Sequence, residues 1–264
     1  DPESIVRATD GADAVVNLVG ILSQSGAQKF DAVQSGGSAA IADACRKAGI
    51  EKLVHVSAIG ADANGESDYA RTKAEGERIV REIVPTATIL RPSIVFGPKD
   101  AFFNRFAEMA RLSPALPLIG GGKTRFQPVY VDDVADSICA AVTDPATRGQ
   151  TYELGGPEVY SFRELMEFML KVIGRRRLLV PVPFPVAGVM GSAGDIANLL
   201  PFVDAPITSD QVKLLKKDNV VGASGEAHIR TIDDLGLKPK SVEAIVPTYL
   251  VRFRKYGQFS PETV

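Results

Sequence analysis

The sequence predicts an α/β fold with a doubly wound parallel sheet, and two alternating patterns carry this prediction. Apolar runs of strand length occur at 13–19, 52–57 and 87–91. Such runs are typical of parallel strands that are covered on both faces. Helical patterns fill the segments between them, at 30–48 and 68–84. Regular alternation of strand and helix is the pattern of a doubly wound sheet.

Size and composition are those of an ordinary globular protein. The 264 residues are 45% apolar and carry a net charge of -2, which gives no reason to expect a nucleic-acid partner. Cys45 and Cys139 fall within apolar helical runs and are expected to be reduced core residues. No histidines or cysteines have metal-ligand spacing, so no metal is expected. No run of 18 uninterrupted apolar residues could span a bilayer.

A Tyr-x-x-x-Lys pair lies on the helix predicted at 68–84, which Ser67 or Asp68 can cap. Tyr69 and Lys73 are i and i+4, so they share one face of that helix. An ammonium beside a phenol favours the phenolate, so Lys73 is expected to lower the pKa of Tyr69 from about 10. A phenol tuned in this way can exchange a proton with a carbonyl or alcohol. The alternative is a chance pair on a solvated helix face.

Four motifs in order resemble the extended and atypical short-chain dehydrogenase/reductases, which include NAD-dependent epimerases and dehydratases. They are Asn17-Leu18-Val19-Gly20 and Val56-Ser57 at two strand ends, Tyr69-x-x-x-Lys73, and Arg91-Pro92-x-x-Val95-Phe96-Gly97-Pro98. The resemblance implies a Rossmann-type domain that binds NADP or NAD, with NADP favoured. It also implies that Tyr69 and Lys73 are catalytic residues in any family enzyme.

The same resemblance implies which residues hold the dinucleotide. Lys73 would bond the nicotinamide ribose, and Pro92 with the backbone of Ile94 and Val95 would meet the carboxamide. The full set of cofactor-binding positions implied in this way is Asn17, Leu18, Val19, Gly20, Ser57, Tyr69, Lys73, Pro92, Ile94 and Val95.

The chain departs from the family pattern at its start. A Rossmann fold opens with a Gly-rich strand–turn–helix that holds the pyrophosphate, and no such motif occurs near residue 1. We therefore expect an N-terminally incomplete domain that lacks its first βαβ units. We assign 1–98 and 126–155 to the NAD(P)-binding domain. A smaller C-terminal α/β lobe for substrate or partner is assigned to 99–125 and 156–264.

Two segments need separate interpretation. Gly120-Gly121-Gly122-Lys123-Thr124 resembles the end of a P-loop, but Pro117 stands where that loop needs glycine, so a simple turn is expected. The segment 150–157 is expected to be the last strand of the sheet. The apolar stretch 184–202 either faces a membrane or partner, or packs under the lobe. It lacks the Lys/Arg band of an interfacial helix, which favours packing.

A narrower resemblance, carried by 126–134, 206–221 and 249–257, is to the nucleotide-binding accessory subunits of respiratory complex I (NADH-ubiquinone oxidoreductase) and their bacterial relatives. It implies an NAD(P)-binding protein whose dinucleotide is mainly structural or regulatory, with a role related to ubiquinone. The implied partners are complex I subunits or a membrane-peripheral protein. The implied location is cytoplasmic, with peripheral association at the inner membrane face as a variant.

The alternative function is enzymatic. It is an NAD(P)-dependent reductase, epimerase or dehydratase that acts on a carbonyl or sugar-nucleotide small molecule through Tyr69 and Lys73. Enzymes of the family carry a hydroxyl directly after the serine that ends the second strand, and here that position is Ala58. The loop from Ala58 to Tyr69 is also shorter than in the extended enzymes. Both departures leave catalysis open.

Overall fold

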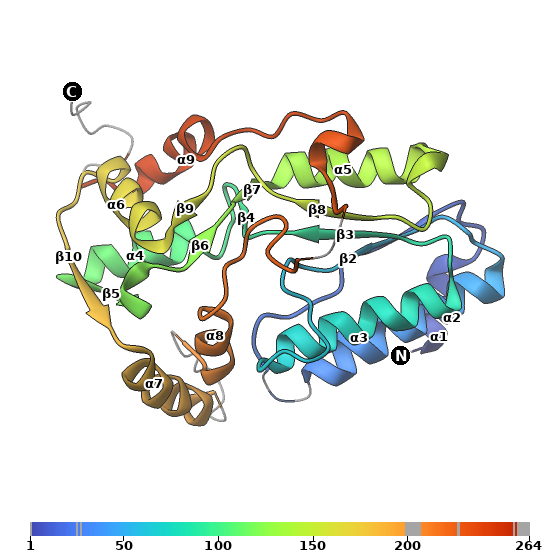
Figure 1. The fold of residues 1–264 in the computed structure, drawn as a ribbon, viewed down its shortest axis with the longest axis horizontal. Coiled ribbons are helices and arrows are strands. Elements are labelled where there is room, and N and C mark those ends of the chain that lie inside the picture. Colours follow the sequence, from blue (N-terminus) through green and yellow to red (C-terminus); the bar gives the residue numbers. More distant parts are fainter. Residues whose placement is uncertain are drawn as a thin grey trace.

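The computed structural model of the protein describes residues 2–24, 26, 28–198, 207–225, 228–255 and 257. Within these ranges a five-stranded, all-parallel sheet forms the centre of the molecule (Figure 1). Its strands, in spatial order, are β1 (Val15–Asn17), β2 (Leu53–Val56), β3 (Thr88–Pro92), β8 (Thr151–Leu154) and β11 (Arg230–Thr231).

Helices cover both faces of this sheet. On one face lie α1 (Pro2–Thr9), α2 (Gly37–Ala48) and α3 (Asp68–Ile83), and on the other lies α5 (Val131–Thr143) (Figure 1). Successive strand residues point to opposite faces. Accordingly, Leu53 joins an apolar cluster with Val80 of α3, while Val54 joins a second cluster with Val134 of α5. The predicted doubly wound parallel sheet is confirmed.

The ends of the sheet differ from the prediction. The strand expected at 13–19 is only β1, and Val16 is 39% exposed, so the expectation of burial on both faces is wrong there. Among the described residues β1 pairs with β2 alone, which leaves the strand at a sheet edge. The segment 150–157 is not the last strand either, because the short polar β11 pairs beyond β8.

The helix predicted at 30–48 begins with a π-helical turn, η1 (Asp31–Gly36), before α2. Gln34 is buried within this turn, and its side-chain amide donates to the carbonyl of Ile21. The same side chain accepts a hydrogen bond from Thr72 of α3. The turn therefore ties the segment after β1 to α3.

A second apolar core lies in the C-terminal lobe, around α4 (Phe103–Leu112), α6 (Phe162–Val172) and α9 (Val242–Leu250). Phe102, Phe126 and Phe162 meet there at ring-centroid distances near 6 Å. Ser161 and Glu164 form a capping box at the start of α6. Residues 199–206 and 258–264, which belong to the predicted lobe, lie outside the described residues.

Three small two-stranded sheets lie outside the central sheet in the described residues. β5 (Ala115–Ile119) pairs with β10 (Leu178–Val182), β4 (Val95–Phe96) with β7 (Val129–Tyr130), and β6 (Arg125–Phe126) with β9 (Tyr160–Ser161). Between β5 and β6 the three glycines form the turn η2 (Gly120–Gly122), each at positive φ. This is the turn expected from the sequence. The remaining short helices are η3 (Pro145–Thr147), η4 (Ile232–Leu235) and η5 (Val251–Phe253).

The apolar stretch predicted at 184–202 forms α7 (Phe184–Ala197), and its final residues lie outside the described residues. Its buried face consists of Ala187, Gly191 and Gly194, and it packs against α8 (Ser209–Leu214). The opposite face is apolar and exposed, with Val189 73% accessible. α7 therefore packs on the lobe along one face only.

Two predictions from composition have different outcomes. Cys45 is buried, as expected, but Cys139 is exposed, so its assignment to the core is wrong. Cys139 lies in α5, and the apolar run along this helix does not determine which of its residues face the sheet. Within the ranges that the structure describes, no helix combines the length and hydrophobicity that crossing a membrane requires.

Because α7 packs closely on α8, a side chain at Gly191 should destabilise the fold. A Cβ there would lie 2.7 Å from Ser209 Cα, whereas a Cβ on Gly188 meets nothing within 4 Å. We expect Gly191→Ala to lower the free energy of unfolding by about 1–2 kcal/mol through overpacking. The control Gly188→Ala should raise it by about 0.5–1 kcal/mol, the gain in helix propensity. Urea denaturation measures both, and equal effects would contradict the packing argument.

Candidate functional site

The carboxyl ends of β1, β2 and β3 bring most of the predicted site residues together. Asn17 ends β1, Ser57 follows β2 and Pro92 ends β3, and these strands are adjacent and parallel. In open α/β sheets, ligands bind in the crevice outside this edge. α3, with Tyr69 and Lys73, covers the same end of the sheet.

Lys73 reaches this edge from α3. Its ammonium donates to the carbonyl of Val56 at 3.3 Å, and its Nζ lies 3.1 Å from the position that a Cβ on Gly20 would take. A side chain at position 20 would therefore crowd the ammonium. Burial lowers the pKa of Lys73, while the charge of Glu77, one turn further along α3, acts in the opposite direction.

Tyr69 lies one turn before Lys73, as predicted. Ser67, two positions before Tyr69, caps the helix. Its ring packs edge-on against Phe30 at a centroid distance of 5.9 Å. Burial raises the pKa of Tyr69 to about 12. The expectation that Lys73 lowers this pKa is wrong in the structure, because the shift comes from burial, which makes a phenolate withdrawn from water costly.

Ser57 carries the clearest sign of a ligand. The residue is 4% exposed, and its Oγ is a buried side-chain oxygen for which the described residues provide no hydrogen-bond partner. Its backbone amide is occupied by the carbonyl of Leu90. Buried hydroxyls nearly always have partners. A polar group at this edge, such as a ribose hydroxyl or a carboxamide, fits the Ser57 hydroxyl.

Asn17 shapes the turn after β1 rather than pointing into solvent. Its Nδ2 donates to Nδ1 of His55 at 2.9 Å, and its Oδ1 accepts from the backbone amide of Val19 at 3.0 Å. His55 is therefore neutral, and burial lowers its pKa to about 3. Leu18 and Val19 are 65% and 45% exposed, so this turn presents an apolar surface at the site.

The segment after β3 is held by a residue that the sequence analysis missed. Asn219 accepts hydrogen bonds from the backbone amide of Ile94 and from Ser93 Oγ, and it donates to the carbonyl of Ile59. The carbonyl of Ile94 accepts from the amide of Val129. Both backbone groups of Ile94 are thus used within the protein. Val95 is 36% exposed and begins β4.

A buried row of charges lies between α3 and the sheet. Arg91 of β3 donates two hydrogen bonds, of 2.9 and 2.8 Å, to the carboxylate of Glu77. Its guanidinium also lies 3.7 Å from Glu153 of β8. The other oxygen of Glu153 accepts from the amide of Gly222. All three side chains are at least nine-tenths buried, so each charge depends on its partners.

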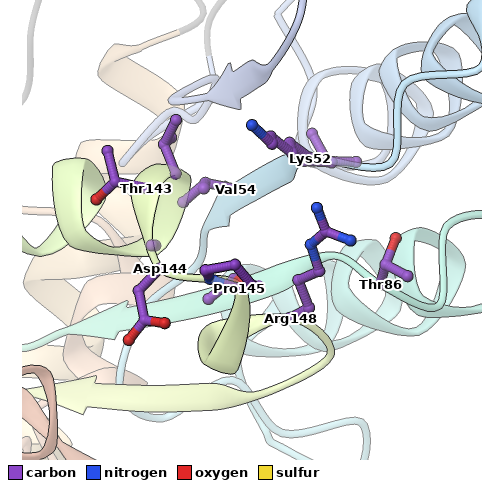
Figure 2. Close-up of a pocket in the computed structure, with 11 residues that line it drawn as sticks. Lys52, Val54, Thr86, Thr143, Asp144, Pro145 and Arg148 are labelled. Carbon is purple, nitrogen blue, oxygen red and sulfur yellow. The ribbon is translucent and has the colours of Figure 1, made fainter.

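A cavity of about 100 Å³ lies away from this site, at the amino ends of the strands. It is lined by Lys52 before β2, Thr86 before β3 and Arg148 (Figure 2). None of the predicted site residues lines it. In the part of the chain that the structure describes, no cluster of three or more His, Cys, Asp or Glu side chains could hold a metal ion.

The parallel sheet, with a lysine-bearing helix over the carboxyl ends of its strands, defines a Rossmann-type fold of the short-chain dehydrogenase/reductase kind. Residues 1–155 match the model of the "NAD dependent epimerase/dehydratase family". The chain belongs to this family.

Two curated relatives and one solved structure show the degree of likeness. "NADH dehydrogenase [ubiquinone] 1 alpha subcomplex subunit 9, mitochondrial" of Arabidopsis thaliana is 34% identical over 100% of this chain and 66% of its own length. The protein of the same name from Mus musculus is 34% identical over 99% of this chain and 67% of its own length. A dTDP-glucose 4,6-dehydratase from Streptomyces venezuelae, solved with NAD bound, superposes with a TM-score of 0.68 at 20% identity, covering 96% of this chain and 76% of its own.

The neutral state of His55 predicts a pH effect on stability. Since the folded pKa is about 3 and the unfolded value is 6.5, the unfolded chain binds the additional proton between these limits. Stability is therefore lost as pH falls below 6.5, by about 2 kcal/mol from this group between pH 7 and 5. His55→Gln should flatten the pH dependence of urea denaturation by this amount. The exposed control His228→Asn should not, and equal slopes for wild type and His55→Gln would refute the effect.

The buried charges predict a second effect on stability. Arg91→Met leaves Glu77 and Glu153 buried without their cation, and we expect a loss of about 3–5 kcal/mol in the free energy of unfolding. Arg78→Met serves as the control, because Arg78 pairs with Glu75 and Glu82 at the exposed surface of α3, the helix that carries Glu77. It should cost less than about 1 kcal/mol. Denaturant titrations compare the two, and similar losses would contradict the assignment.

Proposed function

We propose that the protein binds NAD(P) at the carboxyl ends of β1, β2 and β3, and that the dinucleotide is mainly structural or regulatory. The observation that carries the proposal is that a buried lysine and a buried hydroxyl, to which the described residues offer no hydrogen-bond partner, both lie at the carboxyl ends of these strands. The Lys73 ammonium lies beside Gly20 and donates to the carbonyl of Val56, the residue that precedes Ser57 in the chain. Lys73 would bond the nicotinamide ribose, and Ser57 would bond a polar group of the same half of the cofactor.

The relatives support a role of the accessory-subunit type. Two proteins 34% identical to this chain carry the name of a subunit of "NADH dehydrogenase [ubiquinone]". By this likeness we propose that the partners are subunits of such a complex or a membrane-peripheral protein, and that the role relates to quinone. The preference for NADP over NAD is proposed from the resemblance in the sequence motifs alone, since the relatives named here carry NADH in their names. Because the chain spans about two thirds of those relatives, the partner and the quinone role rest on the likeness alone.

Two features of the site disfavour proton transfer. Burial raises the pKa of Tyr69 to about 12, so the phenol keeps its proton at neutral pH. Ala58 provides no hydroxyl where enzymes of the family have one. The alternative is an NAD(P)-dependent reductase, epimerase or dehydratase for a carbonyl or sugar-nucleotide substrate. It is supported by the placement of Tyr69 and Lys73 one turn apart on α3.

Dinucleotide affinity in two variants tests the proposal. Lys73→Met removes the ammonium and should weaken NADPH binding at least tenfold, while Tyr69→Phe should change it less than twofold. The exposed Lys47→Met serves as a control for the loss of a charge. Isothermal titration with NADPH and NADH measures affinity, and a wild type saturated at a hundred times Kd should gain about 2.7 kcal/mol of stability.

Release of the bound nucleotide separates the two functions. Protein expressed from its full reading frame is denatured, and any nucleotide is identified by mass spectrometry. Retained NADP(H) that no carbonyl compound oxidises or reduces would support the structural role. Readily exchanged NAD(H), together with turnover that Tyr69→Phe abolishes, would establish the enzyme instead. A wild type that retains and binds neither dinucleotide would refute the proposal.

A further inference from the structure

The amino end of α3 is completed by a residue more than 140 positions away. The carboxylate of Asp210, in α8, accepts hydrogen bonds from the backbone amide of Asp68 at 2.7 Å and from that of Tyr69 at 3.1 Å. It also accepts from Ser67 Oγ at 2.8 Å. A helix leaves its first amides without partners inside the helix. Two of them on α3 are bound by this one side chain, and Ser67 accepts a third from Ala70.

Residues 208–222, here called the docking segment, carry Asp210 and are themselves firmly placed. Thr208 and Gln211 form a capping box at the start of α8. Val212 is buried against Ile119 and Ala187 of the lobe. Gly191 of α7 lies so close to Ser209 that no side chain fits between them. Figure 1 shows α8 between α7 and α3.

The docking segment also contacts the other parts of the dinucleotide-binding edge. Gln211 donates to the carbonyl of Leu22, in the segment after β1. Asn219 binds the loops that follow β2 and β3, through Ile59 and Ile94. The amide of Gly222 binds Glu153, at the end of the buried row of charges. Each strand end that carries a predicted cofactor residue is thus held by the same stretch of chain.

We propose that Asp210 is a positioning residue for the dinucleotide site: by capping α3 from the C-terminal lobe it fixes Tyr69 and Lys73, so that dinucleotide binding and docking of residues 208–222 stabilise each other. The proposal rests on the proposed function and deepens it. The Tyr69 amide is bound directly by Asp210, and Lys73 lies one turn further along the same helix. Coupling of this kind is reciprocal, so an effect of the docking segment on binding requires an equal effect of binding on the segment.

A matched pair of variants tests the positioning role. Asp210→Asn keeps the size of the side chain but removes its charge and one acceptor. Asp43→Asn is the control, because Asp43 pairs with Arg46 at the exposed surface of α2, outside the docking segment. We expect Asp210→Asn to weaken NADPH binding at least tenfold and Asp43→Asn to change it less than twofold. Titration with NADPH and with NADH gives the affinities.

Hydrogen–deuterium exchange provides a readout that a merely structural role would not move. In the wild type, NADPH should slow amide exchange across residues 208–222 as well as across 66–73. In Asp210→Asn the protection of 208–222 by NADPH should be lost. The wild-type measurement needs no variant, so it decides the question even if Asp210→Asn fails to fold.

Three outcomes would overturn the proposal while leaving the proposed function intact. They are a wild type that binds NADPH with no change in exchange at 208–222, an Asp210→Asn variant with wild-type affinity, and an Asp43→Asn variant weakened as much as Asp210→Asn. A wild type that binds neither NADPH nor NADH would refute the proposed function, and the coupling with it.

Discussion

The position of α3 on the central sheet depends on three buried charged residues between them: Glu77, Arg91 and Glu153. A carboxylate withdrawn from water is costly unless a cation and hydrogen bonds replace the lost hydration. Arg91 meets this need for Glu77 with two hydrogen bonds. It is also the cation beside Glu153, which in turn binds Gly222. These contacts fix the position of α3 relative to β3, β8 and the docking segment. A small shift of α3 along the sheet would break them.

That register places the candidate site. Lys73 lies one turn before Glu77 on α3, so fixing Glu77 against Arg91 also fixes how far Lys73 reaches toward the carboxyl ends of the strands. The glycine at position 20 leaves room for the ammonium, and the Val56 carbonyl accepts from it. At its amino end the same helix is held by Asp210. A rigid helix fixed at two points is a suitable support for groups that must meet a ligand within a few tenths of an ångström.

The features of this site that could be predicted from the sequence follow from local patterns or from the regular spacing of residues in helices and strands. Ser67 and Asp68 were the two predicted caps because capping residues lie beside the helix they begin, and the structure selects Ser67. Tyr69 and Lys73 were assigned to one face by their spacing, and the ends of parallel strands meet at one edge whatever their side chains. Asp210 and Asn219 were missed, because they act on partners 142 and 125 positions away. No local pattern marks such contacts, and the two-residue β11 gives no apolar period to detect.

The wrong expectation for the pKa of Tyr69 has a physical lesson. From sequence spacing, the ammonium of Lys73 acts on the phenol as a nearby charge, which favours the phenolate. Burial acts on both groups at once, and it disfavours the charged form of each. For Lys73 the charge of Glu77 opposes this effect without reversing it, and no such charge acts on Tyr69. The buried phenol therefore keeps its proton, while Nζ of Lys73 remains a hydrogen-bond donor at the carboxyl ends of the strands. A site built in this way suits the dinucleotide recognition that we propose better than proton transfer, because recognition needs only the hydrogen-bonding geometry of Lys73.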